Sequence, residues 1–192
     1  MRLVIISTPI GFLGSGKGGG VELTLNSLVS GLLNLNHKVN VVAPINSYLS
    51  ESCRSANLFT VQGSEQKSWQ HQDYYTKTKF SKDSIINSML EKALSLMNNC
   101  DAIINLSYDF LPIYKTLEVN YPMLHLISMG DESLEISDII SKVYVKYPYN
   151  FAFHSKAQAL DYPFIKEPII LGNGFELSKY NFQAKKEGPL GW

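Results

Sequence analysis

The chain has 192 residues with 17 acidic and 17 basic side chains, and 45% of its residues are hydrophobic. A chain of this length forms a core of its own without disulfide or metal staples, and its balanced charge argues against nucleic acid as a partner. The two cysteines lack metal-site spacing, no apolar run reaches the ~20 residues of a membrane span, and no signal-peptide pattern precedes the first apolar run, so we expect no bound metal, no integral membrane segment and a cytoplasmic location.

Short apolar runs alternate with segments of helical periodicity along the chain. The apolar runs predict strands at residues 3–7, 39–43, 58–62, 102–106, 123–127, 151–154 and 169–171. The periodic segments predict helices at residues 23–35, 84–98, 111–117, 131–142 and 156–161. Residues 46–82 are polar and, apart from the strand at 58–62, largely irregular, which is typical of a functional or mobile segment. The alternation therefore predicts an α/β fold with a parallel sheet.

A glycine-rich segment follows the first predicted strand, and its sequence is Gly14-Ser15-Gly16-Lys17-Gly18-Gly19-Gly20-Val21-Glu22. Glycines let backbone N–H groups approach an anion without hindrance from Cβ, and a helix N-terminus attracts negative charge. The dinucleotide fingerprint requires an acid at the end of the second strand, where Ala43 stands, and the phosphate-loop pattern requires Ser or Thr at Gly18. We therefore interpret the segment as a loop for a diphosphate or a sugar.

Small and polar residues follow several predicted strands, and these loops are candidates for the rim of a ligand site. In an open parallel sheet, ligands bind outside the carboxyl ends of the strands. The loops are residues 7–20, 107–112, 128–131, 155 and 172–174.

The order of these features resembles the N-terminal half of family 4 glycosyltransferases, which have the GT-B architecture of two Rossmann-like domains. Asn36 stands where the family has Gly before His, and Gly172 and Glu176 stand for Pro and Asp in its "PNG-x-D" turn. The matching runs are Gly19-Gly20-Val21-Glu22, His37-Lys38-Val39-Asn40-Val41-Val42-Ala43, Phe153-His154-Ser155 and Ile169-Ile170-Leu171-Gly172-Asn173-Gly174-Phe175-Glu176-Leu177.

The resemblance implies a Rossmann-like sheet with helices on both faces over residues 1–188. Leu190-Gly191-Trp192 resembles the first strand of the second, nucleotide-sugar-binding domain, so residues 189–192 are expected to begin a domain that the chain does not contain. The implied activity is retaining, metal-independent transfer of a hexose from a nucleotide sugar to a small acceptor. No cofactor is implied, and we expect these residues alone to be inactive.

The resemblance also implies roles for particular residues. The donor loop is Gly18, Gly19 and Gly20 with Lys17 and Glu22, and the cleft between domains includes Ser155, Asn173 and Gly174. The residues implied for acceptor binding are Tyr108, Asp109, Ser128, Met129 and Gly130. The candidates for a catalytic group are Asp109, His125 and Ser128.

Residues 7–25 are also similar to a cyanobacterial subgroup that transfers glucose from UDP-glucose to tetrahydrobiopterin. This narrower similarity implies glucose as the sugar and a pterin as the acceptor. Two other functions stay open, namely a non-catalytic nucleotide or small-molecule binding module of Rossmann type and a dinucleotide-dependent oxidoreductase. The sequence does not predict the oligomeric state.

Several side chains have two interpretations each. Glu22 accepts from a ligand hydroxyl, or it caps the helix as an acid in the first turn. Asp109 accepts from an acceptor hydroxyl or amine, or it caps the next helix. His125 is catalytic or is a hydrogen-bonded core histidine. The aromatic residues of the polar segment are Trp69, Tyr74, Tyr75 and Phe80. Either they stack on a flat acceptor, or the loop packs on its own aromatic side chains.

Overall fold

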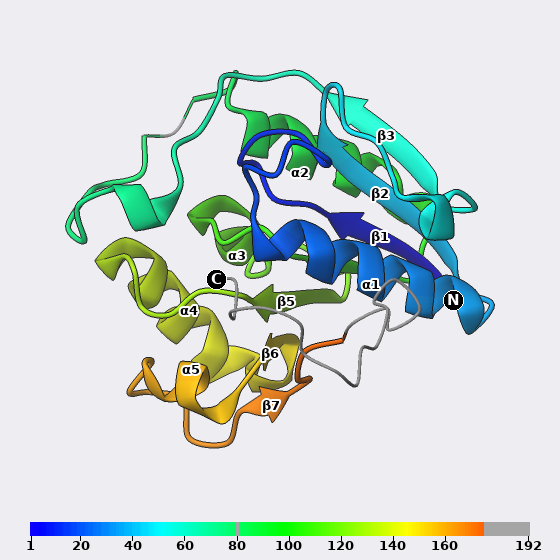
Figure 1. The fold of residues 1–192 in the computed structure, drawn as a ribbon. Helices are drawn as coiled ribbons and strands as arrows, with labels where there is room; N and C mark the ends of the chain where they lie inside the picture. The colour runs from blue at the N-terminus through cyan, green and yellow to red at the C-terminus, as the bar shows by residue number, and fades with distance from the viewer. Residues whose placement is uncertain (80, 175–192) are drawn as a thin grey trace, which may run out of the picture.

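The computed structural model describes residues 1–79 and 81–174, which form an α/β fold on one parallel sheet (Figure 1). The strands are β1 (Arg2–Ile6), β2 (Lys38–Pro44), β3 (Asn57–Val61), β4 (Ala102–Asn105), β5 (Met123–Ile127), β6 (Phe151–Phe153) and β7 (Ile169–Ile170). They lie in the order β3-β2-β1-β4-β5-β6-β7, with every neighbouring pair parallel. The predicted Rossmann-like α/β fold is confirmed.

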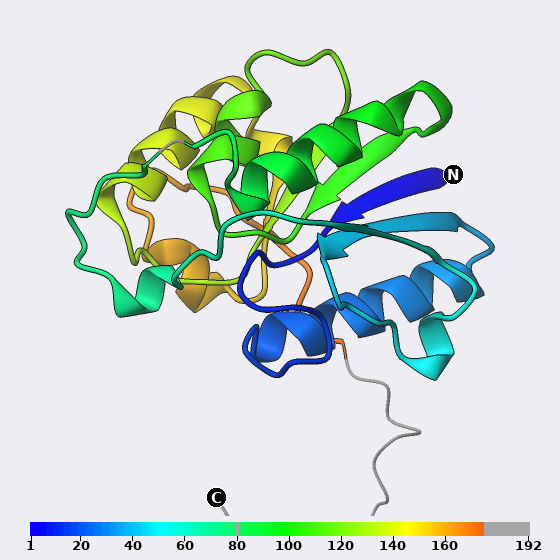
Figure 2. The same cartoon turned by 90° about the horizontal axis from the view of Figure 1, so that it is seen from above.

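Helices cover both faces of the sheet, as Figure 2 shows. They are α1 (Gly20–Asn34), α2 (Ile85–Ser95), α3 (Phe110–Lys115), α4 (Leu134–Lys146) and α5 (Lys156–Leu160). Helix α1 lies on one face, and α2, α3 and α4 lie on the other. Helix α4 begins later than the sequence pattern predicts because the Ser133 hydroxyl accepts from the Ile136 amide and thereby sets the first turn. No helix among the residues described is both long enough and apolar enough to cross a bilayer.

The hydrophobic core has two layers because the central strands are buried on both faces. In β1, Ile5 packs in the same cluster as Leu25 of α1. Its neighbours Val4 and Ile6 pack on the opposite side, in the same cluster as Met89 of α2. Successive side chains of a strand point to opposite faces, so the continuous apolar run in β1 serves both layers.

Helix α1 ends in a left-handed turn that explains Asn36. The amide of Asn36 donates to the Leu33 carbonyl at 2.9 Å, and the amide of His37 donates to the Leu32 carbonyl at 3.0 Å. This pair of bonds requires a left-handed residue after the helix, and Asn36 has φ 61°. Asn tolerates this conformation better than other non-glycine residues, so it can replace the Gly of the family pattern.

Replacing Gly31 by Ala is expected to raise the free energy of unfolding by about 0.5–1 kcal/mol. Gly31 is an exposed residue inside α1, and a Cβ added there meets nothing within 4 Å. The substitution therefore removes backbone entropy from the unfolded chain without causing a clash. Urea unfolding of the two proteins measures the difference, and a lower midpoint for the Ala variant would contradict this prediction.

The polar segment between β3 and α2 forms a closed loop, which we call the 62–84 loop (Figures 1 and 2). Its ends meet where the Ser64 amide donates to the Asp83 carbonyl at 2.7 Å and the Ile85 amide donates to the Ser64 carbonyl at 3.2 Å. Its middle is held near α4, because the Leu134 amide donates to the Tyr74 carbonyl at 3.0 Å. These bonds give the predicted irregular segment a defined shape.

The aromatic residues of the 62–84 loop divide between the core and the surface. Trp69 is only 5% exposed and packs in the same core cluster as Tyr108. Tyr74 and Tyr75 contact each other edge to face, with ring centroids 5.3 Å apart, and Tyr75 is exposed. Phe80 lies outside the described residues. Packing of the loop on its own aromatic groups therefore accounts for Tyr74 and Tyr75, while Trp69 joins the core.

Candidate functional site

A cavity of about 430 Å³, which we call the central cavity, lies at the carboxyl ends of the middle strands. Its walls come from the glycine-rich loop, the start of α1, the 62–84 loop and the segments that follow β1, β4, β5, β6 and β7. The strand order reverses between β1 and β4, and open sheets bind ligands at such a reversal. The predicted site residues that line it are Lys17, Gly18, Gly19, Gly20, Tyr108, Ser128, Met129, Asn173 and Gly174.

Glu22 holds the glycine-rich loop in place from the first turn of α1. Its carboxylate accepts from the Gly14 amide at 2.7 Å and from the Gly18 amide at 2.9 Å, and the Ser15 hydroxyl donates to it at 3.4 Å. Glu22 is 7% exposed and does not line the central cavity. The structure supports neither of its two interpretations. Glu22 does not line the cavity, and α1 has no side-chain cap bond, because the carboxylate bonds to amides that precede the helix.

Part of the predicted donor loop is already engaged by the protein. The Gly18 amide donates to Glu22, and the Gly19 amide donates to the Gly16 carbonyl at 3.1 Å. The next two residues, Gly20 and Val21, line the central cavity, and their amides have no hydrogen-bond partner among the residues described. The donors open to an anion are therefore Gly20 and Val21, in the first turn of a 15-residue helix.

The loop after β5 is held by two tyrosine hydroxyls. The Tyr108 hydroxyl donates to the Gly130 carbonyl at 3.2 Å, and the Tyr162 hydroxyl donates to the same carbonyl at 2.8 Å. Burial raises the pKa of Tyr108 to about 12, so its phenol stays a neutral donor near pH 7. Gly130 itself does not line the central cavity, and a Cβ there would lie 2.7 Å from an Asp161 carboxylate oxygen.

Gln158, on α5, connects the segments that follow β5 and β6. Its side-chain amide donates to the carbonyls of Ile127 and Met129 at 2.9 and 3.0 Å. Its side-chain oxygen accepts from the His154 amide at 3.0 Å. The sequence analysis missed Gln158 and Tyr162, because neither belongs to a motif and both act through contacts between segments distant in sequence.

His154 is a cavity residue that the sequence analysis named only within a matching run. It lines the central cavity, and its Nδ1 donates to the Gly172 carbonyl at 3.0 Å, which leaves Nε2 as an acceptor in the neutral ring. Its neighbour Ser155 is exposed and does not line this cavity. Instead, the Ser155 hydroxyl accepts from the Gln158 amide at 3.1 Å and caps α5.

Ser128 presents a buried hydroxyl at the wall of the central cavity. The residue lines the cavity, and its Oγ is buried with no hydrogen-bond partner among the residues described. A buried hydroxyl without a partner costs about 1–3 kcal/mol. A ligand or a water molecule that bonds to it would remove this cost, which makes Ser128 a candidate ligand contact.

Asp109 caps α3 and does not line the central cavity. Its Oδ1 accepts from the Leu111 amide at 3.1 Å, and its Oδ2 accepts from the Gln66 side-chain amide. The carboxyl group is 1% exposed. Burial raises its pKa, while the hydrogen bonds from Gln66 and Leu111 act in the opposite direction. The capping interpretation of Asp109 is the one that its hydrogen bonds support.

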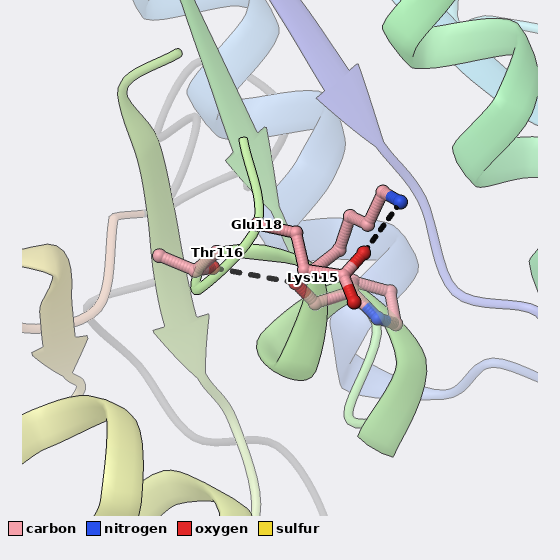
Figure 3. A network of polar contacts seen from close by, with 4 residues as sticks. Lys115, Thr116 and Glu118 are labelled. Carbon is pink, nitrogen blue, oxygen red and sulfur yellow. Dashed lines mark hydrogen bonds and ion pairs between the residues drawn. The ribbon is translucent and has the colours of Figure 1, made fainter. Parts of the chain in front are cut away.

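His125 lies in the core, where it is 1% exposed. Asn105 Nδ2 donates to its Nδ1 at 3.0 Å, so the ring carries its proton on Nε2. That proton is donated to the Thr116 hydroxyl at 2.7 Å, and Thr116 donates onward to the Pro112 carbonyl at 3.3 Å. Figure 3 shows Thr116 at the end of α3, beside the ion pair of Lys115 and Glu118.

The environment of His125 gives it a structural role. Burial lowers the pKa of the imidazole to about 3, so the ring is neutral near pH 7. Both ring nitrogens have partners within the chain, and the residue does not line the central cavity. The structure therefore supports the interpretation of a core histidine, whose partners are side chains.

Within residues 1–79 and 81–174, no group of three or more His, Cys, Asp or Glu side chains is placed to hold a metal ion. Residues 175–177, which end the run that resembles the "PNG-x-D" turn, and the expected domain start at residues 189–192 lie outside the described residues. Comparison of the chain with protein-family models and with curated protein sequences gives no match. The fold and the central cavity define a Rossmann-like α/β protein, and the glycosyltransferase family stays a prediction.

Proposed function

We propose that the chain is the acceptor-side domain of a retaining, metal-independent glycosyltransferase, which transfers a hexose from a nucleotide sugar to a small acceptor. The observation that carries this proposal is that Gly20 and Val21 line the central cavity and that, in the part of the chain that the structure describes, their amides have no hydrogen-bond partner. Together with the Lys17 side chain at the same wall, they suit a diphosphate. Negative charge develops on a nucleoside diphosphate as it leaves the sugar, and fixed donors stabilise that charge.

The other walls of the central cavity suit an acceptor. Trp69 and Tyr108 provide aromatic surface, and the Ser128 hydroxyl lacks a partner among the residues described. A flat, polar ring such as a pterin would stack on aromatic surface and bond to a hydroxyl. We therefore propose a pterin as one class of acceptor. Glucose as the sugar rests on the similarity of residues 7–25 alone, and the remaining donor contacts would lie on a second domain.

A second candidate function is a nucleotide or small-molecule binding module without transferase activity. One observation favours it, because no Asp or Glu among the described residues lines the central cavity. A general base in the described part of this cavity would then be the His154 imidazole. In either function, the amides of Gly20 and Val21 would bind the phosphates of the ligand.

Replacing Gly20 by Pro tests the anion site. Gly20 is the first residue of α1, a position where Pro fits the helix and removes only an amide that has no intrahelical partner. We expect UDP-glucose to bind the native chain and to bind the Gly20→Pro variant roughly tenfold more weakly. Isothermal titration measures both affinities, and urea unfolding checks that the variant folds.

The Gly31→Ala variant is the matched control, since it changes a glycine of the same helix away from the cavity. Its affinity for UDP-glucose should equal that of the native chain. A parallel titration with NAD separates the proposed function from that of an oxidoreductase. Tighter binding of NAD than of UDP-glucose would contradict the proposal, as would equal binding of UDP-glucose by the native and Gly20→Pro chains.

A further inference from the structure

A second cavity, of about 580 Å³, lies against the 62–84 loop, and we call it the lysine cavity. Most of its wall is the 62–84 loop itself, and the rest comes from α2 and from the start of α3, where Asp109 and Leu111 lie. Trp69 belongs to the walls of both cavities. The volume falls within the range of sites that bind small molecules.

Four lysines line this cavity, and they are Lys67, Lys77, Lys79 and Lys82. The only ion pairs among the described residues are Arg54–Glu51 and Lys115–Glu118, so none of the four has a carboxylate partner there. The chain as a whole has no net charge, whereas the wall of this cavity holds four lysines and only two carboxyl groups. Ammonium groups around one cavity repel each other, and a bound anion removes that repulsion.

The carboxyl groups at the lysine cavity do not neutralise these lysines. They belong to Glu65 and Asp109, and both oxygens of Asp109 already accept hydrogen bonds, from Gln66 and Leu111. Burial also raises the pKa of Asp109, which favours its neutral form. The Glu135 carboxylate accepts from the Thr78 backbone amide but does not line the cavity. The four lysines therefore outnumber the two carboxyl groups at the wall, which keeps a net positive charge when the lysines are protonated.

A hydroxyl at the same wall supports binding of an anion. Thr78 lies between two of the lysines and lines the cavity, and its Oγ1 is buried without a hydrogen-bond partner among the residues described. The loop that carries it is held at both ends by the bonds of Ser64 and near its middle by the bond from Leu134 to Tyr74. The lysines consequently surround a cavity of defined shape.

From these observations we infer that the lysine cavity binds a small molecule that carries a phosphate or carboxylate group. Lys67, Lys77 and Lys82 would provide the charge, and the Thr78 hydroxyl would donate a hydrogen bond. Because Trp69 lines both cavities, a bound molecule would lie near the central cavity, where the proposed donor site is. The anion-binding inference is independent of the proposed function. The further step, that the bound molecule is the acceptor of the transferase, rests on the proposed function.

The test follows the fluorescence of Trp69, which becomes the single tryptophan of the chain after Trp192→Phe. The probes are inorganic phosphate, glucose 6-phosphate and citrate, each titrated against potassium chloride of equal ionic strength. We expect a saturable change with at least one probe. The variant K67Q/K77Q/K82Q, in the same background, should bind that probe about tenfold more weakly.

The matched control is K142Q/K156Q/K166Q, which removes the same charge from exposed lysines that line neither cavity. Its affinity should stay within about twofold of the background chain. Equal weakening in both triple variants, or no response to any probe beyond that of chloride, would overturn the inference. Binding of phosphate but not of citrate would identify a phosphate group as the recognised chemistry.

A separate titration distinguishes this inference from the proposed function. UDP-glucose binding should depend on Gly20 and not on the three lysines. If UDP-glucose does not bind while a probe still binds in a lysine-dependent way, the proposed function fails and the anion site stands. If UDP-glucose binds in a Gly20-dependent way while no probe binds in a lysine-dependent way, the anion site fails and the proposed function stands.

Discussion

Replacing Glu22 by Gln is expected to lower the free energy of unfolding by roughly 2–3 kcal/mol and to weaken nucleotide-sugar binding roughly tenfold or more. The carboxylate accepts from the amides of Gly14 and Gly18, which fold the glycine-rich loop back onto α1. A Gln side chain keeps one acceptor oxygen and places an NH₂ group against the other amide. That amide would lose its partner, and the loop would lose the shape that leaves Gly20 and Val21 open.

Urea unfolding and titration with UDP-glucose measure the two effects. Glu91→Gln is the matched control, because Glu91 is an exposed acid on α2 whose carboxylate, within residues 1–79 and 81–174, accepts only from the Asn87 side chain, at 3.0 Å. It should change the unfolding free energy by no more than about 0.5 kcal/mol. If the Glu22 and Glu91 variants behave alike, the carboxylate of Glu22 does not hold the loop.

Replacing His125 by Leu is expected to lower the free energy of unfolding by about 3 kcal/mol at pH 7.5. The imidazole accepts from Asn105 and donates to Thr116, and both partners are buried. A leucine of similar size leaves the Asn105 amide and the Thr116 hydroxyl without one hydrogen bond each. Thr116→Val removes only one partner of the imidazole and should therefore cost less than His125→Leu.

The same histidine makes stability depend on pH. Its pKa is about 3 in the folded chain and about 6.5 when unfolded. The unfolded chain therefore binds the proton first, so the contribution is complete above about pH 6.5 and declines as the pH falls toward 3. Between pH 7 and pH 5 the native chain should lose about 2 kcal/mol through this group, and the His125→Leu variant should lack that loss.

Asp109 changes the pH dependence of stability in the opposite direction. Its pKa is raised in the folded chain, so the folded chain protonates the Asp109 carboxyl at a higher pH than the unfolded chain does. The difference between the native and His125→Leu chains cancels that contribution, so it isolates His125. Unfolding in urea at both pH values gives the comparison. An equal pH dependence in the two chains would show that His125 is not buried as a neutral group.

Much of the fold was predictable from local patterns. The strand β5 has the predicted bounds, and α2 begins directly after Ser84, which the sequence analysis had placed in the helix and which caps it. Apolar runs and helical periodicity are local patterns, so they indicate strands and helices without knowledge of tertiary contacts. The start of α4 was predicted too early because acids at the start of a helix and a capping serine give similar signals, and Ser133 supplied the hydrogen bond.

The candidate site was predictable only in outline. The glycine-rich loop and the strand-exit segments were expected at one edge of the sheet, and they line the central cavity. The roles of single residues were less predictable: Glu22 bonds within its own loop, His125 lies in the core and Asp109 caps α3. Each of these side chains has two interpretations in sequence. Burial and hydrogen-bond partners decide between them for His125 and Asp109, and they give Glu22 a third role within the glycine-rich loop.

The sequence by itself determined the order of elements, the parallel sheet and the position of the glycine-rich loop, because periodicity and glycine content act over a few neighbouring residues. Only the tertiary structure decided which amides of that loop stay open. Gly18 and Gly19 have partners within the chain, while Gly20 and Val21 line the central cavity without one among the described residues. Hydrogen bonds between backbone groups and a side chain several residues away depend on the folded path of the chain, which no local pattern records.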